Sequence, residues 1–224
     1  RTLGLTLLLF ATLFSCMRQE KPLPAELSRA ESVMWEHPDS ALSILRSMPQ
    51  SSLSIGKNYA TWALLLAQAR DKVYGKRLPD SLNIPSSDKL VQDAMDYFEK
   101  EGDLKRMAQT YYYKGQLLKD QKKITEAMPF FLKSKEMMTK LDEPLFTYLI
   151  CQSLGNMYRY QDLYEESLVQ LKDAYQYALR SGNGERISYA LSELGRTYVH
   201  KNEMDSALFY FGKSLDNAQR LGNI

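Results

Sequence analysis

Apolar and small residues recur along most of this chain at spacings of three and four, the spacing that places side chains on one face of an α-helix. Two stretches show the pattern in the same form: Cys151, Leu154, Gly155 and Tyr158, and then Leu191, Leu194, Gly195 and Tyr198. Turn-forming Gly, Pro, Asn and Asp separate such stretches, and no segment has the strict alternation of a half-buried strand. The pattern predicts an all-α chain of ten helices that pair as about five antiparallel hairpins.

A set of positions repeats every 40 residues, which indicates a structural repeat. A glycine is followed three residues later by Leu or Tyr, twelve residues later by Ala or Ser, and four residues after that by Phe or Leu. The four columns are Gly115, Gly155, Gly195; Leu118, Tyr158, Tyr198; Ala127, Ser167, Ala207; and Phe131, Leu171, Phe211. Because several independent columns agree at one offset, chance is a poor explanation.

Each column has a physical reason. A glycine in mid-helix costs ~1 kcal/mol against alanine, so it is expected where a neighbouring helix leaves no room for a side chain. We expect the Ala or Ser of the second helix to be that neighbour. A basic residue ends each second helix, where it complements the helix dipole, and a left-handed cap is due two residues later. These pairs are Lys100 and Gly102, Lys140 and Asp142, Arg180 and Gly182, and Arg220 and Gly222.

The spacing divides the repeat region, 25–224, into units at about 25–50, 57–102, 104–142, 145–182 and 185–222. The first unit is expected to have helices near 25–36 and 39–48, with Asp39 as the N-cap of the second. The second unit should have helices near 57–73 and 87–101, joined by an extended loop. Pro129 is compatible with its helix only if that helix begins near Thr125, which would leave the missing N–H in the first turn.

A small residue and a Tyr in the first helix, followed by Ala and Phe in the second, resembles the tetratricopeptide repeat. The resemblance covers about 25–222 and is strongest from 105 onward. It implies a right-handed superhelical solenoid, with helices longer than usual because the family's ordinary period is ~34 residues. Ser167 in place of Ala and Pro129 early in a second helix depart from the family pattern.

The resemblance also implies that the first helices line the concave side of the solenoid. Three columns of these helices face away from the packing residues: Tyr112, Gln152, Ser192; Gln116, Asn156, Arg196; and Lys119, Arg159, Val199. Amides both donate and accept, and Arg or Lys recognises carboxylates, so these columns could hold an extended peptide or a helix. A concave face that is merely polar is the alternative. The family's carboxylate-clamp set of Lys and Asn is matched only in part.

The chain opens with twelve mostly apolar residues, 3–14, too few to span a bilayer but typical of a secretory signal. Leu13 and Ser15 before Cys16 resemble a bacterial lipobox, so we expect a signal over 1–16, lipid on Cys16 and a linker over 17–24. A plain secretory signal with an incidental cysteine is the alternative. Because the chain starts without Met and stops at Ile224 where another helix is due, it is expected to be a piece of a longer protein.

Composition and motif spacing exclude several classes of function. A net charge of +2 and no basic face argue against nucleic-acid binding by this segment. His37 and His200 lie far apart, no metal-ligand spacing of His or Cys is present, and no glycine-rich phosphate loop occurs. Cys151 falls on the face that packs against its own second helix. The sequence therefore predicts no catalytic residue, metal or cofactor.

These features favour a non-enzymatic module that binds a protein or peptide along its concave face, exported to the cell envelope and anchored in the membrane through Cys16. One alternative is the extracytoplasmic sensory half of a transcriptional or kinase regulator whose transmembrane segment is missing here. Another is a regulatory appendage of an enzyme encoded beyond Ile224.

Overall fold

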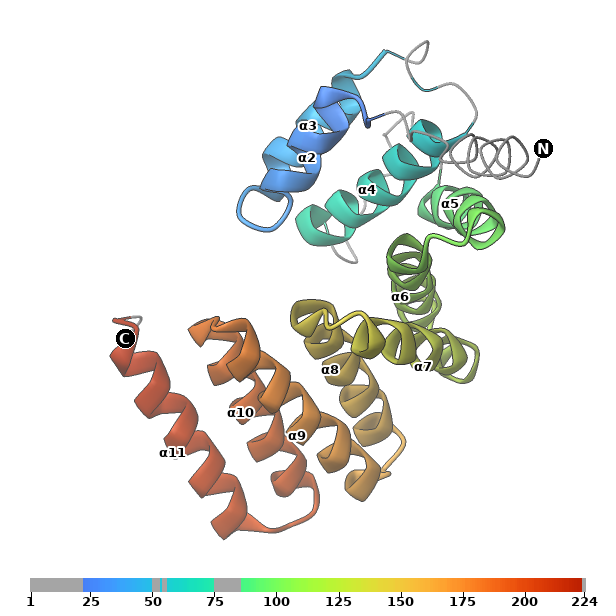
Figure 1. Ribbon diagram of the computed structural model, residues 1–224. Coiled ribbons are helices and arrows are strands. Elements are labelled where there is room, and N and C mark those ends of the chain that lie inside the picture. The colour runs from blue at the N-terminus through green and yellow to red at the C-terminus, as the bar shows by residue number, and fades with distance from the viewer. Residues whose placement is uncertain (1–21, 50–52, 54–55, 75–85, 223–224) are drawn as a thin grey trace, which may run out of the picture.

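The computed structural model describes residues 22–49, 53, 56–74 and 86–222. In these residues the chain forms ten helices and no strand, and consecutive helices pair as five hairpins that follow a curve (Figure 1). The helices are α2 (Ala25–Val33), α3 (Pro38–Ser47), α4 (Lys57–Tyr74), α5 (Ser87–Glu101), α6 (Leu104–Asp120), α7 (Ile124–Lys140), α8 (Pro144–Tyr160), α9 (Tyr164–Ser181), α10 (Gly184–His200) and α11 (Met204–Arg220). The expected all-α repeat solenoid is confirmed.

The 40-residue register is visible in the backbone. The first helices α6, α8 and α10 begin at Leu104, Pro144 and Gly184, and each has 17 residues. The residues at the two turns of each unit repeat their conformation as well. Positive φ angles occur between the two helices at Lys122, Asp162 and Asn202, and after the second helix at Gly102, Asp142, Gly182 and Gly222. The expected left-handed caps are therefore present, and Asp142 adopts the conformation that glycine has in the other units.

The glycines of the first helices lie at close helix crossings, where the nearest side chain is larger than the Ala or Ser expected. A Cβ on Gly155 would lie 2.6 Å from Leu171 Cγ, and one on Gly195 would lie 2.7 Å from a Phe211 ring carbon. On Gly115 it would lie 3.0 Å from the Phe131 ring. The large residue of the second helix lies nearest to each glycine. Beside Gly155 the Ser167 backbone carbonyl also approaches, 3.3 Å from the added Cβ, so the expected Ser neighbour is confirmed there together with Leu171. At Gly115 and Gly195 the nearest atoms belong to the rings of Phe131 and Phe211, because a flat ring fills the groove over a bare backbone.

Small residues further along the second helix contact the first helix in another way. Ser134 Oγ donates to the Ala108 carbonyl at 2.7 Å, and Ser214 Oγ donates to the Ser188 carbonyl at 2.8 Å. Ala108 and Ser188 are two units apart in the register, so the same hydrogen bond recurs at equivalent positions. The fully buried Ala174 takes this place in the unit between them.

The remaining repeat residues pack largely as a solenoid requires. Ala127, Phe131 and Ala207 are buried, while Phe211, in α11, is half-buried. Tyr158 is also half-buried, and Tyr198 stacks on Tyr210 with the ring centroids 5.3 Å apart. Nearest-neighbour packing of this kind builds a continuous core without one central cluster.

Two local expectations were wrong. Asp39 is not an N-cap, because α3 begins one residue earlier at Pro38 with His37 as its cap residue. Proline suits that first position, where its missing N–H would have no intrahelical partner. Helix α7 begins at Ile124, near Thr125 as expected, but Pro129 lies inside the helix, so its missing N–H does not fall in the first turn. It is tolerated on the exposed side of α7, where water can hydrate the unpaired carbonyl.

Three predictions fall outside the described residues: the signal over 1–16, with Cys16 and most of the 17–24 linker, the extended loop over 75–85, and the end of the chain at Ile224. Among the described helices, none combines the length and the apolar character needed to cross a bilayer.

Candidate functional site

The first helices α4, α6, α8 and α10 carry the residues that meet the α2–α3 hairpin across the inside of the curve (Figure 1). We call this surface the inner face. It is the surface on which the sequence placed the three candidate binding columns. Helices α8 and α10 are consecutive first helices, so side chains of equivalent position lie next to each other there.

On α6 the candidate residues bind one another. Tyr112 is only 4% exposed, and its ring lies 5.8 Å from that of Phe131 and 6.0 Å from that of Phe146. Gln116 donates to the Tyr112 hydroxyl at 3.0 Å and accepts from Lys119 Nζ at 2.5 Å. The expectation that Tyr112 faces a ligand was wrong, because the apolar area of its ring is buried against two phenylalanines.

Arg159 of α8 is a structural residue. It is 8% exposed, and its Nη2 donates to Glu193 Oε2 of α10 at 2.8 Å. Glu193 is 1% exposed and also accepts from Arg196 at 2.7 Å, whereas the Arg196 side chain is 58% exposed. Buried charges require such partners. Arg159 therefore joins two units, contrary to its predicted role, while Arg196 remains open to a ligand.

The other candidates divide between packing and surface. Ser192 is 2.9 Å from Ser214 of α11, so its hydroxyl is directed to its own hairpin. Asn156 is half-buried, and its Oδ1 has no hydrogen-bond partner among the described residues. Gln152 is also half-buried and lies beside the Tyr189 hydroxyl of the next unit. Of the binding residues predicted from the sequence, Gln152 lines a hollow on the surface.

That hollow has a volume of about 250 Å³ and is formed between α8 and α10. Its lining residues are Tyr148, Leu149, Gln152, Glu185, Arg186 and Tyr189. Tyr148 is buried, and burial raises its pKa, whereas Tyr189 is 43% exposed. The hollow therefore offers aromatic and apolar walls with an amide, a carboxylate and a guanidinium at their edges.

The hollow has two charged residues, the exposed Glu185 and the half-buried Arg186, and of these only Arg186 can receive an anion. It lies in the first turn of α10, and no carboxylate in the described part of the chain forms a salt bridge with it. Its guanidinium carbon lies 5.7 Å from the centroid of the Trp35 indole. A guanidinium that is not committed to a carboxylate can receive one from a ligand.

Sequence reasoning missed most of this hollow. It followed columns of polar residues, whereas the hollow combines unlike residues of five columns. Tyr189 stands where α8 has Leu149, and Arg186 stands where α8 has Phe146. A search for columns that change from apolar to polar between units could have found Arg186. The Trp35 contact joins residues 151 positions apart in the numbering, and periodicity carries no signal for it.

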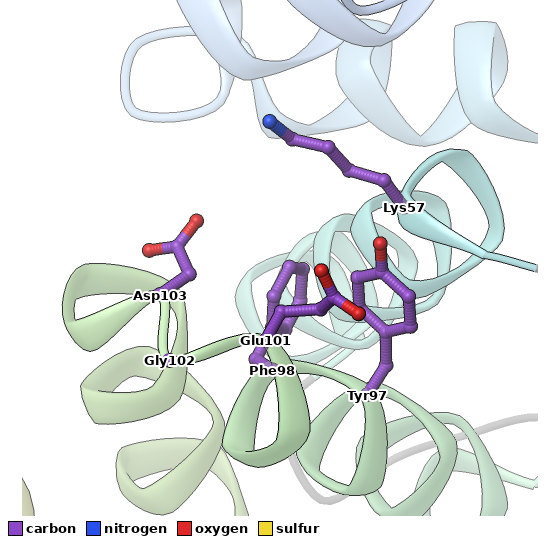
Figure 2. A pocket seen from close by; sticks show the side chains of 6 residues that line it. All are labelled: Lys57, Tyr97, Phe98, Glu101, Gly102 and Asp103. Atoms are coloured by element: carbon purple, nitrogen blue, oxygen red, sulfur yellow. The ribbon is translucent and has the colours of Figure 1, made fainter. Parts of the chain in front are cut away.

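A second hollow, of about 200 Å³, lies where α4 begins and α5 is followed by α6 (Figure 2). Its lining includes Lys57, Tyr97, Glu101 and Asp103. The Asp103 carboxylate caps α6 by accepting from the Arg106 backbone N–H at 3.0 Å, so it is already engaged. Because one of its carboxylates is already occupied in the cap, this hollow is the weaker candidate.

Metal and thiol chemistry find little support. Within the described ranges no three His, Cys, Asp or Glu side chains gather as metal ligands would. Burial raises the pKa of the Cys151 thiol to about 11, so at neutral pH it is a protonated, enclosed group and a poor nucleophile. His200 stacks on Tyr164 with the ring centroids 6.1 Å apart.

Comparison with known proteins rests on structure. No protein-family model matches the sequence, and no curated protein matches it. A Rap protein complexed with Competence and Sporulation Factor superposes with a TM-score of 0.69 at 14% identity, over 94% of this chain and 58% of that one. A signal transduction ATPase with a tetratricopeptide repeat sensor from Pyrococcus horikoshii gives 0.68 at 17%, over 89% of this chain and 30% of that one.

The kinesin light chain repeats from Podosopora anserina, described as nearly identical and tetratricopeptide-like, match with a TM-score of 0.61 at 11% identity. This match covers 89% of the present chain and 96% of the other. At such identities the likeness concerns the fold. With the 40-residue register, the glycine crossings and the repeated caps already described, it leads to one conclusion. This chain has the fold of a tetratricopeptide-repeat solenoid.

Proposed function

We propose that this protein is a non-enzymatic interaction scaffold that captures a peptide or helix of a partner protein on the inner face of α8 and α10. The observation that carries the proposal is the hollow between Tyr148 and Tyr189, with Arg186 at its edge and free of any salt bridge in the described residues. Solenoids present such curved surfaces without needing to close around a substrate.

The lining indicates the chemistry of the captured segment. Tyrosine rings at the hollow favour an apolar or aromatic side chain of the partner, since aromatic residues dominate the energetics of interfaces. The Gln152 amide can pair with the backbone of an extended segment. Arg186 favours a carboxylate near that side chain, and so does the exposed Arg196, which lies later in α10.

A selection from a random peptide library displayed on phage tests the proposal with the full chain. Peptides that bind should combine an apolar or aromatic residue with an acidic one. Their affinity should fall about tenfold or more in Arg186→Ala and in Tyr189→Ala, the loss expected for removing a central contact of 1.4 kcal/mol or more. Tyr160→Ala, which removes a tyrosine exposed elsewhere on α8, is the matched control.

Selected peptides whose affinity is the same in Arg186→Ala, Tyr189→Ala and Tyr160→Ala would refute the site. Failure to select any peptide above background would refute the function itself. These two outcomes separate the position of the site from the existence of binding.

Export and lipid attachment at Cys16 belong to the same proposal. The apolar stretch 3–14 followed by Ser15 and Cys16 supports it. Such an anchor would hold the scaffold at the surface of a cell-envelope membrane. Cells that express the chain and are fed a fatty-acid analogue should label it, and Cys16→Ala should abolish the label. A Cys16→Ala variant that is labelled equally would contradict the anchor.

A second candidate function is the sensory half of a membrane-spanning regulator. In the Pyrococcus horikoshii ATPase a tetratricopeptide repeat is the sensor, and this chain spans 30% of that protein. The coding sequence beyond Ile224 distinguishes the two. About 20 apolar residues followed by a new domain would support the regulator, and a stop codon after a few helices would support the scaffold.

A further inference from the structure

The turn between α2 and α3 reaches across the inside of the curve. Its Trp35 ring lies 3.4 Å from Lys72 Nζ of α4, measured to the ring centroid. The same ring meets Phe146 of α8 edge-on, with the centroids 5.5 Å apart, and lies 5.7 Å from the Arg186 guanidinium carbon of α10. A single aromatic side chain of the first unit thus contacts the second, fourth and fifth units.

A salt bridge extends this contact to the third unit. Glu31 of α2, one helical turn before Trp35, accepts from Arg106 Nη2 of α6 at 2.6 Å. Arg106, Phe146 and Arg186 stand at the same position of three successive units. The edge of the first hairpin therefore lies along one column of the inner face, with one contact for each unit. In Figure 1 the α2–α3 turn is the part of this hairpin that lies nearest to α8 and α10.

Two cations, Lys72 and Arg186, lie close to the Trp35 ring. Burial lowers the pKa of Lys72 to about 8, the neighbouring Asp71 raises it, and the Arg186 cation lowers it further. Lys72 and Arg186 carry the same charge and repel each other, and both lie over the Trp35 ring. An aromatic face attracts both cations and so offsets that repulsion.

We call the contact between Trp35 and Arg186 the closing contact. Arg186 also lines the hollow between α8 and α10. A peptide that enters the hollow and continues toward Phe146 meets the Trp35 ring. We propose that Trp35 is a gate: while its indole lies on Arg186 the first hairpin closes the curve over the inner face, and a peptide bound in the hollow releases it. The proposal rests on the proposed function for its ligand, but the closing contact can be tested without one.

The first test measures the closure in the full chain by electron–electron double resonance. Spin labels on Ser43→Cys in α3 and Gln219→Cys in α11, both exposed positions, report the distance between the two ends of the curve. Cys16→Ala prevents a third label, and the buried Cys151 is shielded from labelling. The parent should give a single narrow distribution, and Trp35→Ala should add a longer population.

Arg186→Gln, which keeps the chain length but removes the cation, should add the same longer population. It also guards against a Trp35→Ala variant that fails to fold. Tyr160→Ala should leave the distribution unchanged. If Trp35→Ala and Arg186→Gln both keep their helical signal and give the parent distribution, the gate is refuted.

The second test uses a peptide from the phage selection. Its addition to the labelled parent should produce the longer population, and Trp35→Ala should bind it several-fold more tightly because no closing contact has to be broken. A peptide that binds the parent and leaves the distance unchanged refutes the gate while the proposed function stands. If no peptide is selected, the proposed function fails, and the variants still decide whether the contact closes the curve.

Discussion

Replacing Gly155 by alanine tests the helix crossing on which each unit depends. Alanine in place of glycine in a helix interior contributes about 1 kcal/mol of stability where there is room for the methyl group. At Gly155 there is no room, since the new Cβ would lie 2.6 Å from Leu171 Cγ and 3.3 Å from the Ser167 carbonyl oxygen. Leu171 is fully buried and its Cγ is not a flexible end, so the two helices must separate.

Overpacking of this kind costs about 1–3 kcal/mol, which cancels the gain and leaves Gly155→Ala about 0–2 kcal/mol less stable than the parent. Gly212→Ala in α11 is the matched control, because a Cβ there has nothing within 4 Å. That variant should gain about 1 kcal/mol. The two variants should therefore differ by about 1–3 kcal/mol, at about 2–4 °C of Tm for each kcal/mol.

Thermal melts followed by circular dichroism measure both variants. A double variant adds the direct test of the contact. In a Leu171→Ala background the space is open, so Gly155→Ala should become stabilising, with a coupling energy of at least about 1 kcal/mol. The reasoning is refuted if Gly155→Ala raises the Tm as much as Gly212→Ala, or if its effect is the same with and without Leu171.

Three further changes probe other parts of the solenoid. Arg159→Met should lower the free energy of unfolding in urea by about 3–5 kcal/mol, because it leaves Glu193 buried with one partner fewer. Arg180→Met breaks an exposed ion pair and should cost about 1 kcal/mol or less. Equal costs would contradict a structural role for Arg159. Pro129→Ala should stabilise α7 by about 1–3 kcal/mol, and an unchanged or lower urea midpoint would show that the proline fits its helix without cost. The folded state keeps the Cys151 proton up to about pH 11, whereas the unfolded thiol loses it near pH 8.5. The free energy of unfolding should therefore fall as pH rises between these values. Cys151→Ala should remove that part of the pH dependence, and an identical pH dependence in both proteins would exclude a contribution from this thiol.

Much of the fold was accessible to sequence reasoning because it depends on local features that recur. Gly102 and Gly182 could be predicted as left-handed caps, since a basic last turn followed by glycine has one common structural meaning. The side chain nearest to Gly155 could not be predicted in the same way. Which side chain fills a groove depends on the crossing of two helices, and the repeat column lists Ser167 and Leu171 with equal regularity.

The binding surface was predicted only in outline. Polarity suggested that Tyr112 and Arg159 face a ligand, yet the first is buried by aromatic neighbours and the second by Glu193. The partners in both interactions belong to another helix or another unit, so the exposure of a side chain cannot be predicted from its own repeat column alone. Trp35 has no counterpart in the repeat columns at all, and only the curvature of the whole array brings it to Arg186.

The central claim is that the structural unit has 40 residues and not the ~34 residues usual for this fold. Deleting 144–183 joins Glu143 to Gly184, the position equivalent to Pro144, and removes one unit in register. That variant should keep the helical signal per residue of the parent and a sigmoidal thermal melt. Deleting 152–185 removes ~34 residues and joins Cys151 to Arg186 inside one first helix, so that Gly195 no longer falls on the packing face; this variant should lose both. The claim is contradicted if the two deletions behave alike.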